Sequence, residues 1–166
     1  MADAPQAPRK PVVVRADTLR TFAKAVFVKA GMPDDHAATV ADVLVWANLR
    51  GQDGHGVMRI PRYVQWTQGG EINTKPNLRL ALDLPAMVML DADRACGPIA
   101  MTRATELAIE RARGSGVGLV MVRGTTHTAA LGYYTLRIAN AGMAGLSVAA
   151  HAVIGHVRNR RGDRKP

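Results

Sequence analysis

The stretch that decides the fold runs over residues 117–150 and reads VGLVMVRGTTHTAALGYYTLRIANAGMAGLSVAA. Its first six residues form a nearly continuous apolar run, which is typical of a strand buried on both faces. Residues 131–141 have the spacing of a helix, and residues 144–150 are apolar again and predict another strand. An amphipathic helix over 97–113 precedes the first of these strands. Strands and helices thus alternate, which predicts an α/β fold.

The residues before this stretch predict helices first and strands afterwards. Apolar residues at helical spacing predict three helices. These helices begin at Asp17, near Pro33 and at Pro61, and end before Gly31, Gly51 and Gly69. Leucines alternate with other residues over 78–84, which predicts a strand with one buried face, and residues 86–91 predict its neighbour. With a further short strand at 12–14, the chain is expected to combine N-terminal helices with part of a mixed-sheet α/β domain.

Two polar segments interrupt this aliphatic pattern. Residues 51–63 contain His55 and Arg59, and residues 122–134 contain His127. Imidazole titrates near neutral pH and guanidinium binds a carboxylate through two hydrogen bonds, so these side chains suit proton transfer beside an anionic substrate. The second segment also leaves a predicted strand at its carboxyl end, where open α/β sheets bind their ligands. Taken singly, each histidine also fits a role in capping a turn, and Arg59 also fits the solvation of a helix end.

Motifs for several other kinds of site are missing from the sequence. Glycines 114, 116 and 118 follow a predicted helix and precede a predicted strand, the reverse of the order that a dinucleotide-binding turn requires. We interpret them as a helix end and a turn. No Walker-type phosphate loop, zinc-type Cys/His cluster or Gly-x-Ser-x-Gly elbow is present, so no metal ligands are expected. The single cysteine, Cys96, predicts a packing residue in a reducing compartment.

The net charge of +9 raises the question of a nucleic-acid partner. Residues 151–166 carry +4 of this charge as a basic tail, and the rest is scattered without interleaved aromatics, so nucleic-acid binding is the least favoured alternative. Residues 1–11, rich in alanine and proline, predict a disordered lead-in rather than a signal peptide, which leaves 12–150 as the folded unit. No apolar run is long enough to span a membrane. No membrane association is therefore expected, and the cytoplasm is the predicted location.

The two polar segments and the residues between them resemble one known family. The matching positions lie within residues 14–149 and are Leu49-Arg50-Gly51, Gly54-His55-Gly56, Arg59, Tyr63, residues 69–73, Asp91, Gly97, residues 108–118, Val122-Arg123, His127 and Gly132-Tyr133-Tyr134. In this order they resemble the malate/L-lactate dehydrogenase family. This is the type without a Rossmann fold, which includes ureidoglycolate and sulfolactate dehydrogenases and cyclic-imine reductases. The resemblance covers only the N-terminal half of the family.

This resemblance implies a reaction and roles for four residues. The reaction is hydride transfer between NAD or NADP and C2 of a 2-hydroxy or 2-oxo acid. His127 matches the family's catalytic acid/base, and His55 and Arg59 match its substrate-binding pair. Tyr63 is expected to form a further wall of the substrate pocket. The resemblance also implies a homodimer and a cofactor-binding arrangement unlike the Rossmann fold.

The sequence departs from the family at three places. Gly54 stands where the family usually has serine, and Thr128-Ala129 stands where it usually has Phe-Gly or a similar pair. These changes affect the choice of substrate more than the type of reaction. From His151 onward the family pattern is lost and arginines become dense, which predicts a truncated member or a shifted reading frame. The cofactor contacts are therefore unknown, and a non-catalytic fragment of such an enzyme is the alternative to an active dehydrogenase.

Overall fold

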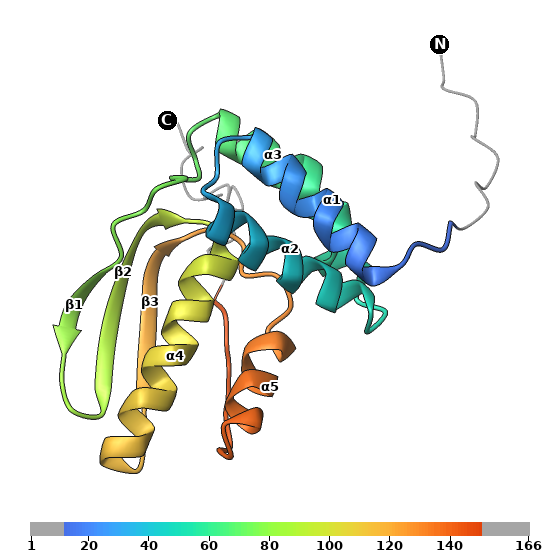
Figure 1. Cartoon of the computed structure of the whole chain (residues 1–166). Helices are drawn as coiled ribbons and strands as arrows, with labels where there is room; N and C mark the ends of the chain where they lie inside the picture. Colours follow the sequence, from blue (N-terminus) through green and yellow to red (C-terminus); the bar gives the residue numbers. More distant parts are fainter. Residues whose placement is uncertain (1–11, 151–166) are drawn as a thin grey trace, which may run out of the picture.

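The computed structural model describes residues 12–150, so the expectations for residues 1–11 and 151–166 lie outside it. The elements follow in the order α1 (Ala16–Lys29), α2 (Asp34–Asn48), η1 (Asp53–His55), η2 (Val57–Arg59), α3 (Ile60–Gln68), β1 (Arg79–Asp83), β2 (Met87–Ala95), α4 (Gly97–Ser115), β3 (Leu119–Thr125) and α5 (Gly132–Asn140). Figure 1 shows α1, α2 and α3 gathered at one end of the molecule, and the sheet with α4 and α5 at the other. Among residues 12–150, no helix combines the length and the apolar character needed to cross a bilayer. The predicted α/β fold class is confirmed.

The N-terminal helices enclose the larger of the hydrophobic cores. Phe27 of α1 and Val40 and Leu44 of α2 are fully buried in it. Helix α3 adds Tyr63 to the same core, and α5 adds Tyr134. A buried tyrosine needs a hydrogen-bond partner for its hydroxyl, so the two phenols must meet polar groups at the border of this core.

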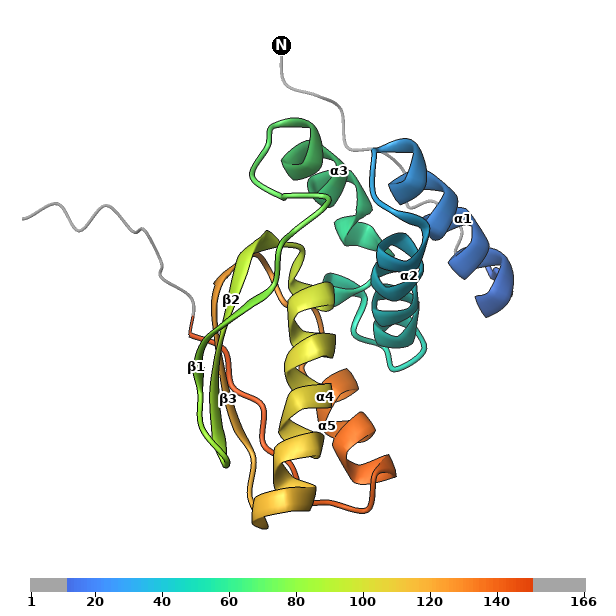
Figure 2. The same ribbon diagram turned by 60° about the vertical axis from the view of Figure 1, so that its left-hand side comes forward.

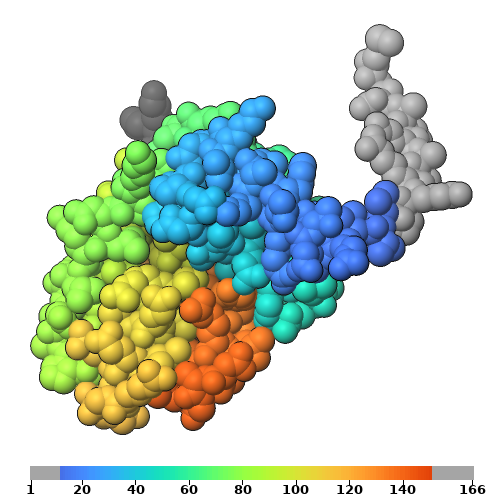
Figure 3. Space-filling view, viewed as in Figure 1, coloured from blue at the N-terminus to red at the C-terminus, as the bar shows by residue number. Residues whose placement is uncertain are grey.

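The sheet has the strand order β1-β2-β3, and its pairing is mixed. Strand β1 pairs antiparallel with β2, and β2 pairs parallel with β3 across the helical connection α4. Val88 and Leu90 of β2, with Val120 and Val122 of β3, pack against Leu107 of α4. Figures 2 and 3 show α4 and α5 side by side on this face of the sheet. This arrangement places the loop after β3 at the end of the sheet nearest to the N-terminal helices.

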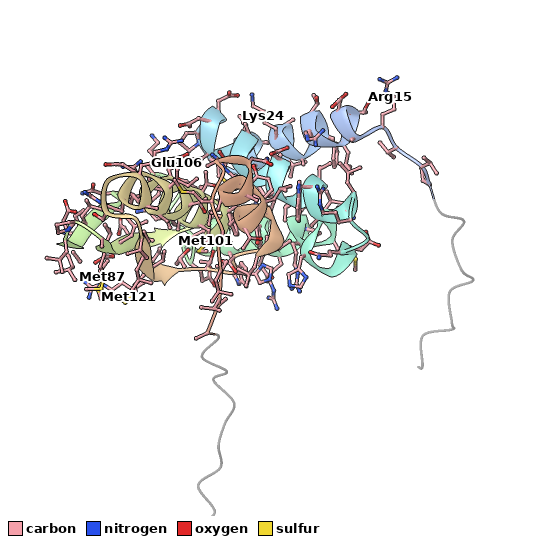
Figure 4. The ribbon with its side chains drawn as sticks, turned by 90° about the horizontal axis from the view of Figure 1, so that it is seen from below. Arg15, Lys24, Met87, Met101, Glu106 and Met121 are labelled. Atoms are coloured by element: carbon pink, nitrogen blue, oxygen red, sulfur yellow. The ribbon has the colours of Figure 1, made fainter. Side chains whose placement is uncertain are left out.

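The opposite face of the sheet is covered by no helix of the described range (Figure 2). Leu119 is 52% exposed and Met121 is 38% exposed. Figure 4 shows Met121 close to Met87 on the side of the molecule that faces away from α1. The prediction of a strand buried on both faces at 117–122 is therefore wrong. Two-sided burial requires a second covering layer, which residues 12–150 do not supply.

Three further predictions about strands are wrong. In β1 a register shift between Leu80 and Leu82 pairs Leu80 with Leu90 and Leu82 with Met89, so these leucines lie on different faces and share no buried face; Leu80 is 41% exposed. Residues 12–14 and 144–150 form no strand, and Leu146 in the second segment is 86% exposed. An apolar segment becomes a strand only where a neighbouring strand offers backbone hydrogen bonds. None of the three described strands pairs with either segment.

Candidate active site

His127 lies in the loop between β3 and α5, at the carboxyl end of β3, as the sequence predicted. Two hydrogen bonds tie the start of this loop to its neighbours. The Gly97 N–H donates to Thr126 Oγ1 over 3.1 Å, and the Thr126 N–H donates to the Ala95 carbonyl oxygen over 3.2 Å. Ala129 has a φ of +58°, a left-handed conformation that residues with a Cβ atom rarely adopt. Its neighbours therefore hold the loop in a conformation that its own residues do not favour.

Gly97, the first residue of α4, allows the loop to approach the helix closely. A Cβ atom here would lie 2.5 Å from the carbonyl carbon of His127 and 2.6 Å from the Cα atom of Thr128. Ordinary van der Waals contacts begin at 3.4 Å. Because the opposing atoms belong to the backbone, they cannot rotate out of the way. The observed position of His127 thus requires glycine at residue 97.

Two buried tyrosines provide hydrogen bonds to successive residues of the loop. Tyr63 Oη lies 2.8 Å from Nδ1 of His127 and donates to the carbonyl oxygen of the same residue over 3.1 Å. Tyr134 Oη donates to the Thr128 carbonyl oxygen over 2.7 Å. Burial raises the pKa of both phenols, so both stay protonated. The side chain of Tyr63, expected at a wall of the substrate pocket, has no exposed surface, and its hydroxyl contacts His127.

Asn48, the last residue of α2, organises the first polar segment. Its Oδ1 accepts a hydrogen bond from the Val57 N–H over 2.8 Å, and its Nδ2 donates to the Asp53 carboxylate over 2.6 Å. One amide side chain thus holds both η1 and η2. His55 is the last residue of η1 and Arg59 is the last residue of η2, so Asn48 sets the positions of both predicted substrate-binding residues.

The structure brings the two polar segments together. The rings of His55 and His127 lie 5.5 Å apart between centroids, with an interplanar angle of 18°. Arg59 donates from Nε to the Gly54 carbonyl oxygen over 2.6 Å. Within residues 12–150, no carboxylate pairs with the Arg59 guanidinium, so its terminal nitrogens remain available to an anionic ligand. The arrangement combines groups that exchange protons with a group that binds carboxylates.

The glycines at 114–118 form no cradle for a pyrophosphate. Gly116 ends α4 at a φ of +77°, and its N–H donates to the Ala112 carbonyl oxygen over 2.9 Å. At Gly118 a Cβ atom would collide with the Ala108 carbonyl oxygen, so this glycine serves the packing of the chain against α4. A pyrophosphate needs backbone N–H groups at the start of a helix, whereas these glycines follow the end of one. The interpretation of residues 114–118 as a helix end and a turn is confirmed.

Three residues that shape the site received no role from the sequence. Gly97 and Tyr134 are among the positions that match the family, and Asn48 stands at the end of a predicted helix. Besides the family match, the sequence signals were a glycine at the start of a helix for Gly97 and a tyrosine on an apolar helix face for Tyr134. Cys96, next to Gly97, is fully buried, and burial raises the pKa of its thiol. The prediction that Cys96 is a packing residue is confirmed.

Comparisons with known proteins find related sequences and structures. A family model described as malate/L-lactate dehydrogenase matches residues 14–157. A malate dehydrogenase of Pyrococcus abyssi is 40% identical over 137 residues, which is 82% of this chain. A ureidoglycolate dehydrogenase (NAD(+)) of Escherichia coli is 35% identical over 135 residues, which is 81% of this chain. The solved structure of malate dehydrogenase from Pyrococcus horikoshii OT3 matches 79% of this chain with a TM-score of 0.78 and 37% identity.

The chain spans much less than the full length of these relatives. It covers 38% of the Pyrococcus abyssi protein, 39% of the Escherichia coli protein and 38% of the solved Pyrococcus horikoshii chain. Most of each relative therefore has no counterpart in these 166 residues. The reactions named for the relatives are properties of the longer chains.

Proposed function

Since the chain belongs to the malate/L-lactate dehydrogenase family, as the sequence predicted, we propose that it forms the substrate-binding and proton-transfer part of a 2-hydroxy-acid dehydrogenase. The observation that carries this proposal is the approach of His55 to His127, with ring centroids 5.5 Å apart, together with the Arg59 guanidinium, which bonds to the carbonyl oxygen of Gly54 next to His55 and has no carboxylate partner among the described residues. A 2-hydroxy acid requires both a group that exchanges a proton and a group that binds its carboxylate. Both are present at this one place.

His127 is the proposed acid/base. When a 2-hydroxy acid is oxidised, the hydrogen on C2 leaves with its electron pair, the hydroxyl loses its proton and a C=O double bond forms. His127 takes the hydroxyl proton and returns it in the reverse direction. Arg59 binds the substrate carboxylate, and His55 orients it so that the oxygen on C2 lies at the imidazole of His127. Tyr63 is buried and acts on this pocket only through its contact with His127.

NAD or NADP is the proposed partner for the hydride, in keeping with the NAD(+) in the name of the Escherichia coli relative. Glycines 116 and 118 serve the end of α4 and its packing, so neither is assigned to this cofactor. The proposed substrate is a small 2-hydroxy or 2-oxo acid. A homodimer and a cytoplasmic location stay predictions from the family resemblance and the cysteine usage.

Substitutions at the two key positions test the proposal. Calorimetric titration of the full chain with NADH and with NADPH measures cofactor binding, and NADH oxidation with a panel of 2-oxo acids measures turnover. His127→Ala should abolish turnover. Arg59→Ala should raise KM about 10- to 100-fold with a smaller effect on kcat, because a hydrogen bond to a charged group contributes roughly 1.5–3 kcal/mol. The matched control is Arg62→Ala, since Arg62 lies three residues further on, in α3, is exposed and bonds to Gln65. Its KM should match that of the parent chain.

Three outcomes would contradict the proposal. Unchanged turnover in His127→Ala would exclude His127 as the acid/base. If neither dinucleotide binds, the alternative of a non-catalytic fragment is favoured, and the anion site can still be tested separately. Titration with L-malate should then shift the imidazole signals of His55 and His127 in NMR spectra of the parent chain. The same titration of Arg59→Ala should shift these signals much less. Unshifted signals in the parent chain would refute the site itself.

A further inference from the structure

The hydroxyl of Tyr63 meets a single residue at two places. Its oxygen lies 2.8 Å from Nδ1 of His127 and 3.1 Å from the backbone carbonyl oxygen of His127. A carbonyl oxygen only accepts hydrogen bonds, so the 3.1 Å contact uses the one proton of the phenol. The phenol oxygen is then the acceptor in the 2.8 Å contact. Its partner, Nδ1, must therefore carry a proton for both bonds to form together.

The position of this proton decides which nitrogen of His127 can act as a base. A neutral imidazole carries a proton on one nitrogen and a lone pair on the other. With the proton on Nδ1, Nε2 has the lone pair that accepts a proton from a substrate hydroxyl. The Ala129 N–H favours the other tautomer. It is a donor located 3.4 Å from Nδ1, so it bonds to Nδ1 only when that nitrogen carries the lone pair. The amide contact is long and therefore weak, and only a proton on Nδ1 lets the phenol bond to Nδ1 while it donates to the carbonyl oxygen, so the two bonds of the phenol outweigh the one of the amide.

We infer that Tyr63 is a positioning residue that holds His127 in the tautomer with the proton on Nδ1, so that Nε2 is the nitrogen that exchanges the proton. Its importance for catalysis rests on the proposed function, whereas the tautomer is a property of the chain without any ligand. An acceptor on Nδ1–H has the same effect in the Ser-His-Asp triad, where it orients the imidazole and fixes its tautomer.

Two features suit Tyr63 to this role. Its ring packs against Trp66 at 5.7 Å and Phe27 at 6.3 Å between centroids, so the hydroxyl has little freedom to leave His127. Burial also raises the pKa of the phenol far above its ordinary range, and the phenol stays neutral wherever histidine titrates. Tyr63 therefore supplies a fixed hydrogen-bonding oxygen and does not itself lose a proton.

The test is NMR spectroscopy of the full chain labelled with ¹⁵N-histidine, at a pH where the imidazoles are neutral. Spectra that link the ring carbon protons to both ring nitrogens report which nitrogen is protonated, and His127→Gln identifies the signals of His127. In the parent chain Nδ1 should show the shift of a protonated nitrogen and Nε2 that of an unprotonated one. Tyr63→Phe keeps the buried ring and removes only the oxygen. The Ala129 N–H then acts on Nδ1 without competition from the phenol, and the two shifts should exchange.

Tyr134→Phe is the matched control, because it removes a phenol from the neighbouring carbonyl of the same loop without touching Nδ1. Its His127 signals should resemble those of the parent chain. The inference is overturned if the parent chain carries the proton on Nε2, if Tyr63→Phe keeps it on Nδ1, or if Tyr134→Phe exchanges the shifts as well. Should Tyr63→Phe fail to fold, the spectrum of the parent chain alone decides. A chain with the expected tautomer and no turnover would contradict the proposed function and leave this inference intact.

Discussion

Replacement of Gly97 by alanine should destabilise the fold and displace His127. The added Cβ atom would lie 2.5 Å from the carbonyl carbon of His127 and 2.6 Å from the Cα atom of Thr128, where ordinary contact begins at 3.4 Å. The loop must therefore retreat from α4 by about 1 Å. The hydrogen bond from the Gly97 N–H to Thr126 Oγ1, now 3.1 Å long, would then exceed hydrogen-bonding distance.

The expected magnitude follows from three contributions. Forcing an extra methyl group into a packed region costs roughly 1–3 kcal/mol. The lost hydrogen bond adds about 1 kcal/mol. Alanine also restricts the unfolded chain, which offsets about 0.4–1 kcal/mol. A net loss of about 2 kcal/mol lowers the melting temperature of a chain of this length by about 4–8 °C.

Thermal unfolding of the full chain, followed by circular dichroism, measures this effect. Gly114→Ala is the matched control, because it lies near the other end of the same helix and a Cβ atom there meets nothing within 4 Å. The control should be stabilised by about 0.4–1 kcal/mol, as is usual when alanine replaces glycine in an unstrained helix. Equal melting temperatures for Gly97→Ala and the parent chain would refute the reasoning that close backbone contact fixes this loop.

Three other substitutions test separate parts of the fold. Tyr134→Phe removes the hydroxyl that donates to the Thr128 carbonyl oxygen, so the free energy of unfolding measured in urea should fall by about 1–2 kcal/mol. An unchanged free energy would mean that another donor replaces this hydroxyl. Asn48→Ala removes the two hydrogen bonds that hold the first polar segment, so the free energy of unfolding should fall by about 1–2 kcal/mol and the NMR signals of His55 should shift. Unshifted His55 signals would contradict the role of Asn48 in positioning His55. A backbone hydrogen bond and the Arg123 guanidinium lower the pKa of Asp91 below its ordinary 3.8, so the stabilisation that Asp91 provides is present above that pH and is lost as the pH falls through the lowered value. Asp91→Asn should therefore flatten the fall in melting temperature below about pH 4, and superimposable acid branches for the two chains would contradict this.

The sequence predicted best those elements whose pattern is local. The helix expected over 97–113 is α4 (Gly97–Ser115), and the helix expected from near Pro33 is α2 (Asp34–Asn48). Apolar spacing, a proline at the start and a glycine at the end all act within a few turns of one helix. The histidine loop was placed correctly for a similar reason, since it directly follows the apolar run of β3.

The wrong predictions concern properties that depend on distant parts of the chain. Residues 144–150 have the apolar composition of a buried strand. A strand also needs a neighbouring strand to pair with, and the sequence of the segment does not specify one. The placement of Leu80 and Leu82 on different faces depends on a register shift in the pairing of β1 with β2. The contact of Tyr63 with His127 joins residues 64 positions apart, and no local pattern encodes it. Tyr63 was therefore placed in the pocket by resemblance, while its hydrogen bonds became known only from the fold.

The left-handed Ala129 has a consequence for how the site assembles. A left-handed conformation costs a residue with a Cβ atom about 1–2 kcal/mol, so the loop does not hold its shape unaided. Its supports come from three different helices, through Tyr63 of α3, Gly97 of α4 and Tyr134 of α5. His127 consequently keeps its place only while all three helices pack against the loop. Transient detachment of any one of them releases the loop, which makes the geometry of the acid/base a cooperative property of the whole described fold.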